Sequence, residues 1–206
     1  MEAEQAVYFE YGEKEIGHLK QRDRKLANAI DRIGFIRREM KPQLFVAIVD
    51  VMISQQISGK AAKTILQRLA HLTDGITALS IDACSVDDIQ QCGMSFKKAA
   101  YIKGLADKVL SGALDLEALR HLPDAKVIES LVQLDGIGLW SAEMLLLFCL
   151  GRPDVLSFGD LAIRRGMMRL YDLQKVSKAA FQKYRSRYSP YGSVASLYLW
   201  RLSVLP

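Results

Sequence analysis

Apolar residues recur at helical spacing along most of the chain. Between Pro42 and Gln56 they occupy positions i, i+3/i+4 and i+7, which lie on one face of an α-helix. Leu139–Leu150 is apolar nearly all round, which predicts a buried central helix that ends at Gly151. No stretch alternates polar and apolar residues convincingly, so we predict an all-α protein of about ten helices joined by short links. The residues before Pro42, about forty in number, are also predicted to be helical. A further helix is predicted to begin after Ser58, which caps it, and the remaining predicted helices are Lys97–Leu110, Pro123–Leu134, Leu161–Tyr171, Ser177–Arg187 and Tyr191–Val204.

The composition is that of one globular domain. Half of the 206 residues are apolar and a quarter are charged, so residues 1–206 can form a single domain of two helical lobes with a cleft between them. The longest apolar run, Met144–Leu150, is much shorter than the about twenty residues of a membrane span, and the first residues lack the pattern of a secretory signal. The three cysteines form no C-x-x-C pair. We therefore expect a cytoplasmic protein without disulfides or a membrane partner.

The positive charge is concentrated near the C-terminus. The chain carries a net charge of +5, but residues 160–206 alone contain nine Lys and Arg against two Asp, a net charge of +7. Such a basic segment on a near-neutral body fits a polyanion, most often a nucleic acid. A solvated basic face is the simpler alternative.

A short glycine-containing link separates two predicted helices at Leu134–Gly138. Gly136 and Gly138 allow a close approach to the backbone, and the first amides of the next helix point outward as an anion site. A phosphate of a nucleic-acid backbone would fit there without base preference. The alternative is a plain αα-hairpin whose glycine caps the first helix.

Asp160 stands where a loop enters the helix Leu161–Tyr171. Asp is a favoured N-cap residue, so capping alone can explain it. A helix N-terminus also favours the ionised carboxylate, and a fixed anion stabilises an oxocarbenium-like transition state. By contrast, the three histidines are widely spaced and predict neither a transition-metal site nor a histidine base.

Aromatic residues offer surfaces on which a base could stack. Trp140 follows the hairpin and Tyr191 begins the last predicted helix, and both are candidates for such a wall or for core packing. Tyr198 and Trp200 fit the helical core pattern, so we assign them to the core.

The polar knuckle Ile53–Ser58 lies between two apolar helices. Its functional interpretation is a loop that enters the minor groove, where a Gln fills the gap left by an extruded nucleotide. Its structural interpretation is a helix–turn–helix link capped by Ser58.

Taken together and in order, these motifs resemble the helix-hairpin-helix DNA glycosylases of the endonuclease III-like superfamily. Within it they are most similar to the alkylpurine branch, the 3-methyladenine DNA glycosylase II family. The resemblance runs from about Pro42 to the C-terminus and rests on four segments, namely Ile53–Ser58, Gly93–Ile102, Leu134–Ala142 and Phe158–Ile163.

The resemblance implies a two-lobed, all-α fold with the active site in the cleft, and hydrolysis of the N-glycosidic bond of a damaged base in duplex DNA. Asp160 matches the catalytic aspartate, and Gln56 matches the intercalating position. Trp140 stands where the bifunctional members place a Schiff-base lysine, and Tyr191 where the alkylpurine branch often has a pocket aromatic. The hairpin matches are Gly136 and Gly138, Ser141 as a hydroxyl residue that touches phosphate, and the carbonyls of Val132, Leu134 and Gly136 as ligands of a Na⁺ or K⁺ ion.

The chain departs from the family pattern in three respects. The residues before Pro42 are too few for the β-rich domain of the longer members. The three scattered cysteines do not match the four-Cys loop of many relatives, so no iron–sulfur cluster is expected. Met144 stands where some members have a pocket tyrosine, which leaves the range of substrates open.

The sequence therefore predicts a monomeric, monofunctional glycosylase that excises alkylated purines such as 3-methyladenine or 7-methylguanine and needs no cofactor. It would be associated with the nucleoid through its DNA. Two alternatives remain at this stage, a bifunctional glycosylase/lyase for oxidised bases and a non-enzymatic DNA-binding module. The former needs an amine nucleophile, which Trp140 does not supply, and the latter has no use for Asp160.

Overall fold

The computed structural model describes residues 6–205, and the chain divides into two compact units. Unit 1 joins Met1–Met40 to Leu146–Pro206, and unit 2 is the continuous stretch Lys41–Leu145. Within the described residues no strand forms, and an isolated antiparallel bridge links Tyr8 and Glu39. The prediction of an all-α protein is confirmed.

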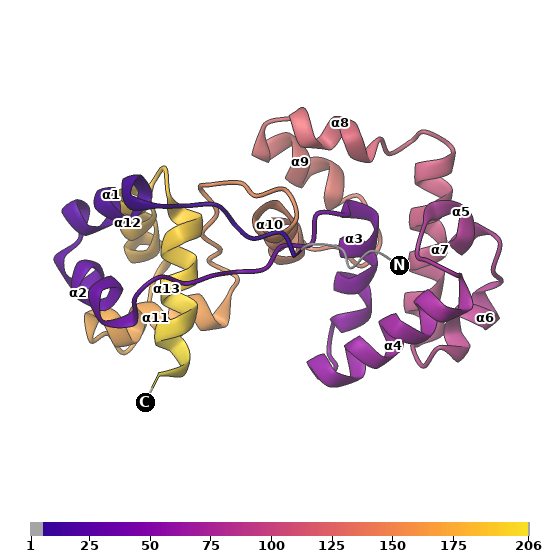
Figure 1. Cartoon of the computed structure of the whole chain (residues 1–206), viewed down its shortest axis with the longest axis horizontal. Coiled ribbons are helices and arrows are strands. Elements are labelled where there is room, and N and C mark those ends of the chain that lie inside the picture. The colour runs from indigo at the N-terminus through magenta and orange to yellow at the C-terminus, as the bar shows by residue number, and fades with distance from the viewer. Residues whose placement is uncertain (1–5, 206) are drawn as a thin grey trace. The chain divides into compact units, whose positions relative to one another are not determined.

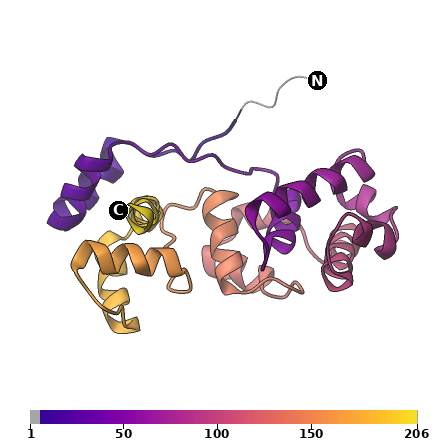
Figure 2. The ribbon, with the colours of Figure 1, turned by 90° about the horizontal axis from the view of Figure 1, so that it is seen from below.

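Unit 1 is organised around helix α13 (Gly192–Val204), most of which is buried; Figure 2 looks along this helix. Tyr198 is fully buried, and Trp200 stacks on Phe148 with 5.2 Å between the ring centroids. The assignment of both aromatics to the core is therefore confirmed. The other helices of unit 1 are α1 (Glu13–Arg22), α2 (Arg24–Ile33), α11 (Leu161–Tyr171) and α12 (Lys178–Tyr188), labelled in Figure 1.

Helices α11 and α13 form the most extensive pair in the molecule, and a glycine allows their close approach. A Cβ atom at Gly166 would lie 2.1 Å from the carbonyl oxygen of Leu199. No larger residue fits there unless one of the two helices moves. Because Asp160 caps α11, this contact also fixes the helix that carries the candidate catalytic residue.

Unit 2 is a bundle in which α7 (Phe96–Leu110) packs against α3, α5 and α6. The buried face of α7 consists of Ala99, Ile102, Leu105 and Ala106. The helical spacing of the sequence predicts Ala100, Ile102, Leu105 and Val109 on this face, but Ala100 is exposed and Val109 is half-buried. The other helices are α3 (Leu44–Ser54), α4 (Gly59–Leu72), α5 (Ala78–Asp82), α6 (Val86–Gln91), α8 (Leu116–His121) and α9 (Asp124–Leu131).

Helix α10 (Leu139–Phe148) begins in unit 2 and ends in unit 1. It is the predicted apolar central helix, although it ends two residues earlier than expected. None of the helices described is both long enough and apolar enough to cross a bilayer.

The helix count and several boundaries differ from the prediction. Residues 6–205 contain thirteen helices where about ten were expected, because α5, α6 and α8 have only five or six residues each. Helix α9 ends at Leu131 rather than Leu134, since the chain turns there towards the hairpin. Before Pro42, α1 and α2 are helical as expected, but residues 34–42 are not.

A buried carboxylate joins the N-terminal helices of unit 1 to its C-terminal helices. Asp23 is 4% exposed and accepts hydrogen bonds from the backbone N–H of Leu26 at 3.0 Å and from the Tyr171 hydroxyl at 2.6 Å. Arg187 also donates to this carboxylate, and the hydroxyls of Tyr171 and Tyr188 are in contact. Burial alone would raise the pKa of Asp23, but the bonds from Tyr171, Leu26 and Arg187 outweigh it and lower the pKa below its ordinary value.

We expect the substitution Asp23→Ala to lower the free energy of unfolding at pH 7 by about 2 kcal/mol, because it removes a helix cap and leaves Arg187 and Tyr171 without their acceptor. The pKa of Asp23 is lower in the folded than in the unfolded protein. Its contribution to the free energy of unfolding is therefore fully present above the unfolded-state pKa of about 4, and it is lost as the pH falls through the folded-state pKa. Urea unfolding at pH 7 and pH 3 measures both effects. Asp31→Ala is the control, because its exposed pair with Lys20 contributes about 0.5 kcal/mol or less; equal losses in the two variants would contradict the prediction.

Candidate active site and nucleic-acid interface

Asp160 is a buried carboxylate at the N-terminus of α11. Its side chain is 7% exposed, and Oδ1 accepts a hydrogen bond from the backbone N–H of Ile163 at 2.8 Å. The capping role that the sequence suggested is therefore confirmed. The cap holds the carboxylate in one orientation. A carboxylate that is fixed and largely removed from solvent can stabilise a developing positive charge.

The loop that leads to Asp160 is held by side chains of the last helix. Ser193 Oγ accepts from the N–H of Val155 at 2.9 Å, and Ser196 Oγ donates to the Val155 carbonyl at 2.8 Å. Asp154 accepts from Ser189 Oγ at 2.6 Å and from the N–H of Gly192 at 3.0 Å. These supporting residues were not predicted from the sequence. The signal available was Ser193 and Ser196, two small polar residues at i and i+3 in the largely apolar first half of α13.

Positive charge lies close to Asp160 along the chain. The guanidinium carbon of Arg164 lies 5.1 Å from the ring centroid of Phe158, and Lys178 Nζ lies 6.0 Å from the same ring. Phe158 also packs edge-on against Phe181, with 5.2 Å between the centroids. These contacts place two cationic side chains around Phe158, just before α11, and such positive charge suits a polyanionic ligand.

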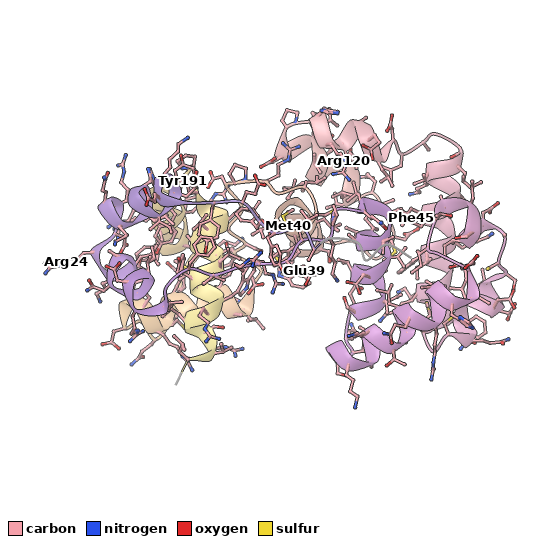
Figure 3. The ribbon with its side chains drawn as sticks, in the orientation of Figure 1. Arg24, Glu39, Met40, Phe45, Arg120 and Tyr191 are labelled. Carbon is pink, nitrogen blue, oxygen red and sulfur yellow. The ribbon has the colours of Figure 1, made fainter. Side chains whose placement is uncertain are left out.

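Tyr191, the candidate pocket aromatic of unit 1, lies beside α1 (Figure 3). Its ring meets that of His18 edge-on at 5.1 Å, and His18 Nε2 lies 3.0 Å from the carbonyl oxygen of Ser189. Tyr191 is half-buried. The N-terminal residues therefore contribute to the surroundings of this aromatic.

The hairpin between α9 and α10 turns tightly on its own backbone. Leu134 and Ile137 are buried, and the N–H of Ile137 donates to the carbonyl of Leu134 at 3.0 Å. The N–H of Ala142 donates to the carbonyl of Gly138 at 3.0 Å, so α10 begins directly after Gly138. The first turn of a helix points its amides along the helix axis and outward, as the predicted anion site requires.

The two hairpin glycines serve different purposes. Gly136 has a φ of +82°, and a Cβ atom there would lie 2.6 Å from Cδ2 of Tyr101. Gly138 is exposed and has ordinary backbone angles, and a Cβ atom at this position would meet nothing within 4 Å. Gly136 is therefore required by the turn itself, whereas Gly138 leaves room for something to approach.

The hairpin carbonyls predicted to hold a monovalent cation are partly engaged. The Leu134 oxygen accepts from Ile137, and the Gly136 oxygen accepts from Nε2 of Gln55 at 2.6 Å. Each carbonyl oxygen has a second lone pair, which can bind a cation while the first lone pair keeps its hydrogen bond. Within the described residues, no group of three or more His, Cys, Asp or Glu side chains converges as a metal site.

The first turns of α10 expose one candidate residue and bury two. Trp140 is 44% exposed, whereas Ser141 and Met144 are 4% and 7% exposed. An exposed indole beside the hairpin is a surface on which a base can stack. The buried hydroxyl of Ser141 offers little surface to a phosphate, and its contact with DNA stays a prediction.

The polar knuckle between α3 and α4 presents Gln56 to solvent. Gln56 is exposed and has a φ of +60°, and Ser58 caps α4 by accepting from the N–H of Ala61 at 3.2 Å. Gln55, by contrast, is half-buried and points to the hairpin. The structure therefore places the predicted intercalating residue at an exposed turn.

Part of the C-terminal positive charge has a structural role. Arg187 pairs with Asp23, Arg185 donates to the Leu156 carbonyl at 3.3 Å, and Arg169 donates to the Leu202 carbonyl at 3.0 Å. The excess of positive charge in this segment is thus only partly available to a nucleic acid.

The candidate residues fall into two groups. The knuckle, the hairpin, Trp140 and Met144 belong to unit 2, where Gln55 joins the first two. Asp160 and Tyr191 belong to unit 1, where Asp154 and the serines of α13 support the segment that carries Asp160.

Comparison with known proteins connects these groups to one family. Residues 49–190 match the family model described as HhH-GPD superfamily base excision DNA repair protein. DNA-3-methyladenine glycosylase 1 of Schizosaccharomyces pombe is 32% identical over 91% of this chain and 86% of its own length.

Solved structures agree with the sequence comparison. DNA-3-methyladenine glycosidase from Bacillus halodurans superposes with a TM-score of 0.87 and 34% identity, over 96% of this chain and 93% of its own. The 3-methyladenine DNA glycosylase Mag1 of S. pombe, in complex with abasic DNA, gives a TM-score of 0.83 and 30% identity, over 93% and 97% of the two chains.

Proposed function

The chain belongs to the HhH-GPD superfamily of base excision DNA repair proteins, and from this membership we propose that it is a monofunctional DNA glycosylase for alkylated purines. It hydrolyses the N-glycosidic bond of bases such as 3-methyladenine and 7-methylguanine in duplex DNA, the first step of base excision repair. The names of its relatives, which include 3-methyladenine DNA glycosylases from fungi and bacteria, support this substrate class.

The observation that carries the proposal is the buried carboxylate of Asp160 at the N-terminus of α11. Departure of the base leaves an oxocarbenium-like sugar, and an anion held in place before the reaction stabilises that charge at little reorganisation cost. Asp160 can also orient the attacking water. A DNA-binding module without activity would need such a carboxylate only as a helix cap.

The substrate class follows from the chemistry available. A purine alkylated at N3 or N7 is cationic and leaves without being protonated, so the enzyme needs no strong general acid. Trp140 and Tyr191 supply aromatic faces for the extruded base, which attract it by stacking and by cation–π interaction. Met144 is the third residue proposed for the base pocket.

The chain lacks an amine where a lyase would need one. Trp140 stands at the position where the bifunctional members of the family have a Schiff-base lysine. Its neighbours Leu139 and Ser141 offer no amine either. Lys126, the nearest lysine upstream, lies in the first turn of α9 and pairs with Glu129 at 2.7 Å. The reaction therefore ends at the abasic site without strand cleavage.

DNA is held through its backbone. The hairpin amides bind a phosphate, Gln56 fills the gap left by the extruded nucleotide, and basic residues of the C-terminal segment neutralise further phosphates. The protein acts as a monomer and requires no cofactor; a Na⁺ or K⁺ ion held by the carbonyls of Val132, Leu134 and Gly136 would support the phosphate.

The test is incubation of the protein with methylated duplex DNA. We expect free 3-methyladenine or 7-methylguanine to be released, an intact abasic strand on a gel run without alkali, and no covalent complex after borohydride treatment. Strand breaks before alkali, or a trapped complex, would indicate a lyase. A folded protein that binds DNA but releases no base would show that it is a binding module.

We expect the substitution Gly138→Val to weaken affinity for every duplex sequence alike, by about tenfold. The new side chain covers the amides that would meet phosphate, while the open space around Gly138 leaves the fold intact. Fluorescence anisotropy with two unrelated duplexes measures the effect, and circular dichroism checks the fold. Gly136→Val is unsuitable because its side chain would collide with Tyr101. Unchanged affinity of folded Gly138→Val would exclude the hairpin from DNA binding.

A further inference from the structure

The segment Gly93–Ile102, at the start of α7, has no role in the function proposed so far. It is one of the four segments that resemble the family pattern, yet none of its residues is assigned to DNA or to the base. In the structure Lys98 of this segment contacts the knuckle, and Tyr101 contacts the hairpin.

Lys98 holds the end of α3. Its ammonium donates to the carbonyl of Ile53 at 2.7 Å and to that of Gln55 at 2.6 Å, immediately before Gln56. Lys98 is half-buried, whereas its neighbour Lys97 is exposed and lies over the ring of Tyr101 at 5.7 Å. A cation bound to the last carbonyls of a helix is a common C-terminal cap, and this is the simplest interpretation of Lys98.

Three further contacts exceed what a helix cap requires. Gln55 Nε2 donates to the Gly136 carbonyl at 2.6 Å, which ties the knuckle to the hairpin across 81 positions of sequence. The ring of Tyr101 occupies the space beside Gly136 that a side chain would fill. On the same helix, Lys108 donates to the Gln133 carbonyl at 3.1 Å. Helix α7 thus supports the knuckle and the hairpin at the same time.

The backbone of Gln56 explains why such support is needed. Its φ of +60° lies in the left-handed region, which residues other than glycine and asparagine adopt rarely. The turn persists because both parts of the preceding residue, Gln55, are bound. Lys98 binds its carbonyl oxygen, and the Gly136 carbonyl of the hairpin binds its side chain. Without these bonds the exposed Gln56 would sample other conformations.

We propose that Lys98 and Gln55 are positioning residues that fix Gln56 relative to the phosphate-binding hairpin. The inference rests on the proposed function, in which Gln56 fills the gap in the duplex while the hairpin holds a phosphate. Both events occur on the same stretch of DNA, so the distance between the two elements has to match the spacing along the strand. Fixing that distance before binding removes the need to order the loop on the DNA.

The experiment compares two duplexes of the same sequence, one intact and one with a tetrahydrofuran abasic analogue that presents a gap. The preference is the ratio of the affinity for the gapped duplex to that for the intact duplex. We expect the wild-type protein to prefer the gapped duplex, and we expect Lys98→Met and Gln55→Leu each to reduce this ratio by about fivefold or more. Affinity for the intact duplex should change no more than in Lys97→Met, which removes the same charge from the same helix.

A double substitution separates positioning from capping. If Lys98 acts through Gln56, adding Lys98→Met to Gln56→Ala should change the preference by less than about twofold. The proposal would be overturned if the two substitutions reduced the preference independently, so that their fold-changes multiplied in the double variant. It would also be overturned if Lys98→Met weakened affinity for the gapped and the intact duplex by the same factor. If Lys98→Met fails to fold, Gln55→Leu carries the test, because it leaves the cap of α3 in place.

The outcomes distinguish the inference from the function on which it rests. A wild-type protein that neither prefers the gapped duplex nor releases methylated bases would contradict the proposed function. A wild-type protein that does both, with Lys98→Met and Gln55→Leu behaving like Lys97→Met, would overturn the positioning role alone.

Discussion

The substitution Asp160→Asn is expected to reduce the rate of base release by at least about 10³-fold, which corresponds to about 4 kcal/mol in the barrier. The asparagine oxygen can still accept from the N–H of Ile163, so the cap of α11 and the fold are retained. What is lost is the negative charge opposite the developing sugar cation. Single-turnover release of 3-methyladenine from methylated duplex measures the change, and affinity for abasic duplex should be largely retained.

Asp172→Asn is the matched control. Asp172 ends the same helix with a φ of +56°, a conformation that asparagine tolerates well, and its substitution removes the same charge. We expect its rate of base release to equal that of the wild type. If Asp160→Asn also keeps near wild-type rates, then Asp160 is a helix cap and the catalytic assignment is wrong.

The substitution Gly166→Ala is expected to destabilise the protein by about 3 kcal/mol or more, although it adds one methyl group. The new Cβ would lie 2.1 Å from the carbonyl oxygen of Leu199 and within 3.0 Å of its Cα. Because these are backbone atoms, relief requires α11 and α13 to separate. Urea unfolding at constant pH gives the loss of free energy, and base release should fall as well, since α11 begins at Asp160.

Gly104→Ala provides the comparison for this prediction. Gly104 also lies within a helix, but a Cβ atom there would meet nothing within 4 Å. There alanine should stabilise the protein by about 0.5 to 1 kcal/mol through its higher helix propensity. A stable Gly166→Ala variant would mean that the two helices of unit 1 can repack at low cost.

The long helices were predictable because each repeats its apolar positions over several turns. Leu161–Tyr171 has the predicted bounds, and Ser58 caps α4 as expected. Helices α5, α6 and α8 were missed because five or six residues do not complete a recognisable period. Their Thr, Ser and Asp caps were present in the sequence but are equally typical of turns.

The motifs of the candidate site could be predicted from the sequence, but the contacts that support them could not. Asp160, Gln56 and the hairpin glycines stand in motifs of recognisable spacing. Lys98 and Gln55 also stand in such segments, but their supporting role was not predictable because their bonding partners lie far away in sequence. The difference between Gly136 and Gly138 depends on the position of Tyr101, which no local pattern contains.

The division of the chain has a consequence for its synthesis. Unit 1 draws on residues before position 41 and after position 145, and unit 2 lies entirely between them. At about 5–20 residues per second, a ribosome needs about 5–20 s to make the intervening 105 residues. During that interval the apolar faces of α1 and α2, with Leu19, Leu26 and Ile30, have been made but lack the partners that α11 and α13 provide. The N-terminal helices of the nascent chain are therefore exposed to chaperones and proteases during this interval, and unit 1 can be completed only after α13 has been translated.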